Sequence, residues 1–295
     1  MTKAQAMLCA VAAYFLWVLG DTAIKYGGLA AVSPFLIMFL LGSVGASCLV
    51  ASAFFKGDLS ILRPHSPREQ AFITVGRVII NYANIIALIH LPLTTFYAVV
   101  FTIPLMVAAM SAAMKHETLS LVKTVCLVAG FAGALLAIGI RSGGGDWVGY
   151  LAAFTSAACF ASGVIAMRKV AKTDSAESVQ FMIALSVTVV GLLGILWAHP
   201  VSPDLRVIAL LVVAGVINII GGVLYVKAVH NTVSTNVTQF HYTQIISGGI
   251  LGYLIWNEVP SWNLLAGSVI IIVAGMIVAS QAHKHKDDLL YDDER

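Results

Sequence analysis

Apolar stretches of about 20 residues recur along this sequence, separated by short polar or Gly/Pro-containing connections. A helix needs about 20 mostly apolar residues to cross the hydrocarbon core of a bilayer, so each stretch is a candidate transmembrane helix. We predict ten spans, at approximately 5–26, 34–55, 70–90, 93–114, 121–140, 147–168, 178–198, 206–228, 233–256 and 262–282. The connections leave no room for an extramembrane domain. The pattern therefore predicts an all-α, multi-pass membrane protein with the lipid bilayer as its main solvent.

The composition agrees with this class. Charged residues make up 11% of the 295 residues and hydrophobic residues 59%, whereas a soluble domain carries about 25% charged residues. The net charge of +3 is small and indicates no nucleic-acid partner. The four cysteines lie in apolar stretches without the spacing of a metal site. We expect no metal and no cofactor.

The distribution of Lys and Arg predicts the orientation, because the excess of these residues stays on the cytoplasmic side of a membrane. With the N-terminus in the cytoplasm, 13 of the 17 Lys and Arg residues fall in cytoplasmic segments. Lys25, Arg141 and Arg206 fall outside, and Arg77 lies within the third span. We expect both termini in the cytoplasm and a location in the bacterial inner membrane.

The two halves of the chain align with an offset near 141 residues. The matched residues are Ala87, Thr94, Glu117 and Ser120 in the first half and Ala228, Thr235, Glu258 and Ser261 in the second. Each half holds five spans, an odd number, so the halves enter the membrane from opposite sides. This is the inverted-repeat architecture of secondary transporters. We predict one repeat over 1–141 and a second over 142–295, which includes a short charged tail.

Several motifs resemble those of the drug/metabolite transporter superfamily, and within it the ten-span proteins with two EamA-type domains. The first half carries HLPLTTFYA at 90–98, FTIP at 101–104 and GFAG at 130–133, and the second carries FHYTQ at 240–244 and GYLIWNEVP at 252–260. One departure is Ile245, which stands where the second repeat often has a counterpart of Pro104. The resemblance implies a transporter rather than an enzyme, and an exporter of amino acids or related metabolites.

Arg77 is a candidate substrate-binding residue because a charge within a span usually faces protein or a watery cavity. Asn81 and Asn84 follow at i+4 and i+7, on the same helical face. A guanidinium with two amides suits a carboxylate or another anionic group. The alternatives are snorkelling to the headgroups or a structural bond to a helix end. The repeat offset maps residues 77 and 84 onto Asn218 and Tyr225, which predicts a facing polar wall.

The ninth span is the most polar of the ten, with Thr238, His241 and Gln244 on one face. His241 could bind substrate, carry a proton or bond to a neighbouring helix. We include these three residues and Tyr97 in the predicted substrate site. Aromatic residues at positions expected to face inward could add stacking walls or serve only as core packing; they are Trp17, Tyr82, Phe96, Tyr97, Phe160 and Tyr242.

Asp21 and Lys25 stand at i and i+4 near the outer end of the first span, which predicts an ion pair, an extracellular gate or a coupling site. Glu117 and Glu258 each precede a new span, where a carboxylate can cap free helix N–H groups. We favour capping over proton transport for both, with Ser120 and Ser261 in support.

These observations predict a secondary transporter that exports a small polar organic metabolite by alternating access around a midplane cavity. An uncoupled facilitator or channel and an importer of a nucleoside-like metabolite are the alternatives. Proton coupling and a homodimer stay open. An enzyme is disfavoured because the sequence shows no nucleophile elbow, paired catalytic carboxylates or nucleotide loop.

Overall fold

The computed structural model describes residues 3–113, 121–138, 146–170, 173–198, 203–231, 237 and 242–292. The elements within them are helices: α1 (Lys3–Leu29), α2 (Pro34–Phe55), η1 (Leu59–Leu62), α3 (Pro67–His90), α4 (Leu93–Val100), α5 (Ile103–Ala113), α6 (Leu121–Ile138), α7 (Trp147–Val170), α8 (Ala176–Ala198), α9 (Leu205–Asn231), α11 (Tyr242–Trp256) and α12 (Trp262–Asp292). The predicted all-α class is confirmed.

The apolar windows coincide with these helices. Seven helices in the described part of the chain are long and apolar enough to cross a membrane, and three shorter apolar helices cover Thr124–Ala137, Thr243–Trp256 and Trp262–Ile277. Each of these segments overlaps one predicted window. The chain is therefore an integral multi-pass membrane protein.

The fourth window, predicted over 93–114, corresponds to one apolar segment that could cross a membrane, Leu93–Met110, but the helix is interrupted within it: α4 ends at Val100 and α5 begins at Ile103. Pro104 explains the break, because its ring lacks an N–H and clashes with the carbonyl four residues earlier, that of Val100. The Thr102 backbone N–H instead donates to Val99 O at 3.0 Å, and the Thr102 hydroxyl donates to the same oxygen at 2.7 Å. The Val99 carbonyl at the break is therefore bonded within the protein.

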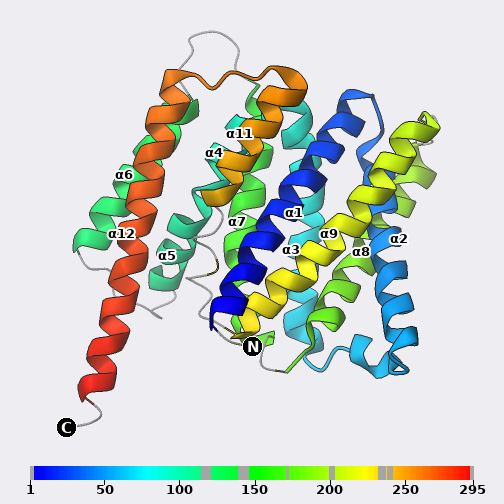
Figure 1. The fold of residues 1–295 in the computed structure, drawn as a ribbon, viewed down its shortest axis with the longest axis horizontal. Helices are drawn as coiled ribbons and strands as arrows, with labels where there is room; N and C mark the ends of the chain where they lie inside the picture. Colours follow the sequence, from blue (N-terminus) through cyan, green and yellow to red (C-terminus); the bar gives the residue numbers. More distant parts are fainter. Residues whose placement is uncertain are drawn as a thin grey trace.

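The helices pack in pairs that are distant in sequence (Figure 1). The most extensive contacts join α1 with α9, α3 with α7, α2 with α8, and α6 with α12. If the halves correspond as predicted, α1 matches α7 and α3 matches α9, so the repeat relates the α1–α9 pair to the α3–α7 pair. The α2–α8 and α6–α12 pairs each join a helix to its own counterpart in the other half. The α6–α12 pair lies at one side of the bundle and the α2–α8 pair at the other, and the α1–α9 and α3–α7 pairs lie between them.

Small residues allow these helices to approach closely. A Cβ at Gly20 would lie 2.4 Å from the Asn218 side chain, and one at Gly221 would lie 3.1 Å from Trp17. Gly221 and its neighbour Gly222 lie inside α9, which runs through both without a break. At the α6–α12 contact, a Cβ at Gly267 would lie 2.3 Å from the backbone oxygen of Gly133.

Gly267→Ala should lower the melting temperature of the purified protein in detergent. The added methyl would meet backbone atoms of α6, which cannot rotate away, and overpacking of this kind costs about 1–3 kcal/mol. Gly163→Ala is the matched control, since apart from the neighbouring backbone of its own helix no atom lies within 4 Å of its added Cβ. An equal melting temperature for both variants would contradict the close contact between α6 and α12.

Candidate functional site

A cavity of about 150 Å³ lies in the middle of the bundle, lined by residues of α1, α2, α3, α4, α5, α7, α8, α9 and α11. One water needs roughly 10–15 Å³ of cavity volume, so the space holds roughly ten water-sized groups. Both predicted halves contribute walls. The volume of the cavity is enough for a small organic molecule.

Most of the predicted site residues meet at this cavity. Those that line it are Asp21, Arg77, Asn81, Asn84, Tyr97, Asn218 and Gln244. Tyr225 lies beside it, in contact with Arg77. Thr238 and His241 lie outside the described residues, and Lys25 is not among the lining residues.

The Arg77 guanidinium lies against aromatic rings. Its central carbon is 4.6 Å from the Phe160 ring centroid and 5.7 Å from those of Trp17 and Tyr225. These distances are within the range of cation–π attraction. Among the described residues no carboxylate lies within 4.0 Å of the guanidinium. Arg77 lines the cavity, which favours the cavity-facing interpretation over snorkelling to the headgroups.

Aromatic residues other than Tyr97 form much of the remaining wall. Trp17, Phe96 and Phe160 line the cavity as expected. Tyr82 does not: its side chain is 40% exposed and its ring lies 5.5 Å from that of Phe35. It stands five residues after Arg77, which places it on the outer side of α3.

The amide side chains are oriented by bonds to the protein. Asn81 Nδ2 donates to the backbone oxygen of Arg77 at 2.8 Å, and Asn84 Oδ1 accepts from the Ser156 hydroxyl. Gln180 Nε2 donates to Gly222 O at 3.1 Å. Ser156 and Gln180 also line the cavity but were not predicted. Gln180 could have been found as an uncharged polar residue in an apolar span, whereas Ser156 gives no such signal.

Asp21 does not pair with Lys25, so the predicted ion pair is wrong. Asp21 Oδ2 accepts from the Tyr97 hydroxyl at 2.9 Å. Lys25 Nζ instead lies 2.5 Å from Glu258 Oε1, donates to Leu91 O at 2.9 Å, and lies 5.1 Å from the Trp256 ring centroid. A partner 233 residues away in the sequence has replaced the local one.

Glu258 caps a helix, as predicted, but not the helix that follows it. Its Oε2 accepts from the backbone N–H of Leu93 at 2.7 Å, at the start of α4. Ser261 caps α12, because its hydroxyl accepts from the Leu264 N–H at 3.2 Å. Glu117 and Ser120 lie outside the described residues. The group formed by Lys25, Leu91, Leu93 and Glu258, here called the Glu258 clamp, joins α1, the α3–α4 junction and the start of the α11–α12 connection.

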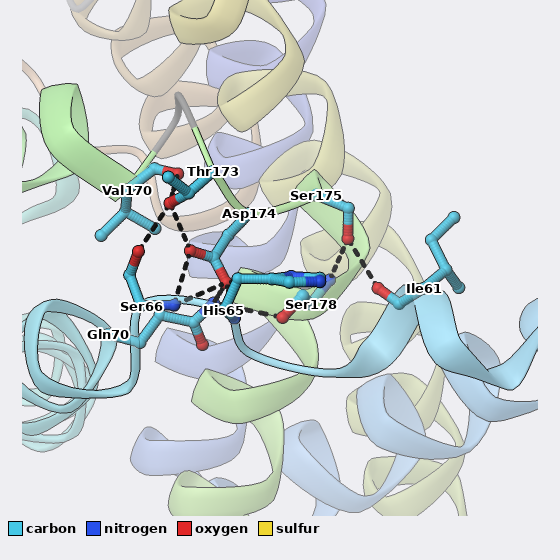
Figure 2. A network of polar contacts seen from close by, with 9 residues as sticks. All are labelled: Ile61, His65, Ser66, Gln70, Val170, Thr173, Asp174, Ser175 and Ser178. Carbon is cyan, nitrogen blue, oxygen red and sulfur yellow. Dashed lines mark hydrogen bonds and ion pairs between the residues drawn. The ribbon is translucent and has the colours of Figure 1, made fainter.

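A second polar cluster lies at the other end of α3, around the buried carboxylate of Asp174 (Figure 2). Asp174 Oδ1 accepts from the His65 N–H at 2.6 Å and from Gln70 Nε2 at 2.7 Å, and Oδ2 accepts from the Ser66 N–H at 3.1 Å. The hydroxyl of the adjacent Ser175 donates to Ile61 O at 2.6 Å. This Asp174 clamp joins the segment before α3 to the α7–α8 turn.

The hydrogen bonds of the Asp174 clamp favour the charged carboxylate. Burial by itself would raise the pKa of Asp174, but the bonds from the His65 N–H, Thr173 and Ser66 outweigh burial and hold this pKa below its ordinary value. The carboxylate also faces the positive end of the α3 dipole.

Comparison with known proteins connects this arrangement to a family. The EamA-like transporter family matches residues 147–280, the second predicted repeat. The chain is 27% identical over 189 residues to the pseudopaline exporter CntI of Pseudomonas aeruginosa, covering 64% of this chain and 66% of that protein. It is 28% identical over 188 residues to an S-adenosylmethionine uptake transporter of Rickettsia bellii, covering 63% and 64%. The alignments thus span slightly less than two thirds of each relative.

A likeness in fold extends over nearly the whole chain. A protein of known crystal structure superimposes with a TM-score of 0.70, over 96% of this chain and 99% of that one, at 21% sequence identity. At this identity the likeness concerns the fold alone.

Lys25→Met should lower stability more than Lys56→Met. The first change removes the ammonium group that pairs with the Glu258 carboxylate, and breaking a buried pair costs about 3–5 kcal/mol. Lys56 is 51% exposed in its pair with Glu177, against 5% for Lys25, and an exposed pair contributes about 1 kcal/mol or less. Thermal unfolding in detergent measures both. Similar losses would contradict a buried clamp.

Asp174→Asn should destabilise the protein in a pH-dependent way. Because the folded pKa lies below the unfolded value of about 3.9, the contribution of Asp174 is complete above that value and is lost as the pH falls through the folded pKa. The difference in melting temperature from the wild type should stay constant between about pH 5 and 8 and shrink below about pH 4.

The exposed Asp204 supplies the control for this titration, since Asp204→Asn should produce a much smaller difference at every pH. A difference for Asp174→Asn that grows as the pH falls would contradict the assignment of a charged, hydrogen-bonded carboxylate.

Proposed function

Because the chain belongs to the drug/metabolite transporter superfamily, with an EamA-like domain over residues 147–280, we propose that it is a secondary transporter that exports a small polar organic metabolite, such as an amino acid or a related compound. The observation that carries this proposal is the central cavity, in which Arg77 has no carboxylate partner among the described residues. A guanidinium offers five N–H donors in a planar fork that suits a carboxylate.

An inverted repeat over 1–141 and 142–295 is supported by the helix pairing. The α1–α9 and α3–α7 contacts exchange under the repeat, and the cavity lies between the two halves. The break between α4 and α5 at the cavity is of the kind seen in transporters, where interrupted helices border substrate sites. Alternating access then follows from movement of one half against the other.

The orientation with both termini in the cytoplasm rests on the positive-inside bias. It assigns the Glu258 clamp to the outer end of the bundle and the Asp174 clamp to the cytoplasmic end. Movement between inward-open and outward-open states would break one clamp at a time. Proton coupling and a homodimer remain open parts of this proposal.

Two alternatives have specific support. One relative is named as an exporter and another for uptake, so an importer of a nucleoside-like metabolite is the second candidate. The cavity volume of about 150 Å³ favours a substrate smaller than a nucleoside. An uncoupled facilitator could use the same cavity, but it would not need to close at either end.

Arg77→Ala should reduce transport at least tenfold in proteoliposomes. The assay preloads vesicles with a mixture of unlabelled amino acids and measures counterflow of the same labelled amino acids. Truncation removes the donors for the substrate carboxylate, and hydrogen bonds to charged groups contribute about 1.5–3 kcal/mol. Arg68→Ala is the control, because Arg68 is an exposed arginine on the same helix.

Wild-type counterflow by folded Arg77→Ala would contradict the site assignment. Flux without saturation or counterflow in the wild type would instead favour the facilitator. Inside-out vesicles that accumulate the labelled amino acids under an imposed gradient would support export.

A further inference from the structure

Two charged side chains line the cavity among the described residues, Asp21 from α1 and Arg77 from α3. No ion pair within 4.0 Å joins them in the described part of the chain. Lys25 stands four residues from Asp21 on the same helix, but the Glu258 clamp holds its ammonium group. The cavity therefore presents one carboxyl group and one guanidinium group that are not joined in an ion pair with any described side chain.

The position of Asp21 is set by its contact with Tyr97. The Tyr97 hydroxyl donates to Oδ2 at 2.9 Å, and Tyr97 itself is 1% exposed. Gly248 of α11 makes room for this ring, since a Cβ there would lie 2.3 Å from Tyr97 Cδ2. An ionised carboxylate has about four acceptor positions, and this bond uses one of them. Asp21 retains the capacity to accept hydrogen bonds from an ammonium group.

Arg77 has the complementary capacity. The aromatic rings of Trp17, Phe160 and Tyr225 contact the guanidinium, but rings do not accept five N–H bonds in the plane of the fork. The planar fork matches a carboxylate in a bidentate arrangement.

We propose that the substrate is a zwitterion, with its amine at Asp21 and Tyr97 and its carboxylate at Arg77. This inference rests on the proposed function and names the substrate class of the same cavity. A buried charge is costly unless it is paired. A zwitterion neutralises both poles at once, an amine leaves Arg77 unpaired, and a carboxylate alone leaves Asp21 unpaired. The cavity holds roughly ten water-sized groups, so a zwitterion that fits in it has the dimensions of a free amino acid.

The experiment measures binding to the purified full-length protein in lipid nanodiscs. The probes are natural amino acids, each tested beside its decarboxylated amine and its deaminated acid, which share the side chain and lack one charge. The amino acids should bind at least tenfold more tightly than either analogue.

Two cavity variants should then separate the poles. Asp21→Asn should weaken binding of the amino acid at least tenfold and leave binding of the deaminated acid unchanged. Arg77→Gln should weaken binding of the amino acid and leave binding of the amine unchanged. Tyr97→Phe keeps the ring and should weaken only probes that carry an amine. Asp58→Asn, which changes an exposed carboxylate outside the bundle, should have no effect. A merely structural role of Asp21 would weaken all three probes equally.

Three results would overturn the proposal: binding of amines or deaminated acids as tight as that of amino acids, equal effects of Asp21→Asn on all probes, or no binding of any amino acid. If Asp21→Asn left binding intact but abolished uptake driven by a proton gradient, the residue would be a proton carrier and the zwitterion assignment would fail. Saturable counterflow of some other solute would in each case leave the transporter proposal standing.

Discussion

Polar and charged groups inside a bilayer need partners within the protein, because lipid tails offer none. Arg77 satisfies this requirement partly through the rings of Trp17, Phe160 and Tyr225, which attract a cation without supplying a counter-charge. The helices that carry these rings, α1, α7 and α9, are also the helices packed most closely around α3 or each other. The arrangement keeps the positive charge within the bundle while leaving its hydrogen-bond donors open to the cavity.

The two clamps follow one rule. In each, a carboxylate from the second half of the chain accepts backbone N–H groups at the start of a first-half helix: Asp174 at α3 and Glu258 at α4. Free N–H groups at a helix start carry partial positive charge and favour an anion. Glu258 differs in that Lys25 adds a full charge. The two halves of the chain are therefore joined at both ends of α3 by carboxylates that accept hydrogen bonds from the backbone.

Periodicity predicted the parts of the site that depend on one helix. One face of a helix carries Arg77, Asn81 and Asn84 whatever the tertiary arrangement. The repeat offset also predicted that Asn218 lies on the facing wall, and it lines the cavity with them. The Asp21–Lys25 pair failed because a flexible lysine side chain can leave its local neighbour for a carboxylate that only the folded chain brings close. The break before Pro104 has a signal in the sequence, whereas the capping of α4 by Glu258 depends on packing between halves and has none.

The Glu258 clamp also bears on leakage. One carboxylate holds both the ammonium group of Lys25 and the N–H of Leu93, so displacement of Glu258 removes a partner from α1 and from α4 at the same time. Neither helix can separate alone without leaving a charge or a backbone donor unpaired in a region of low dielectric. If the protein opens at this end as proposed, the shared carboxylate favours concerted loss of these bonds, which would disfavour half-open states through which ions and water could pass.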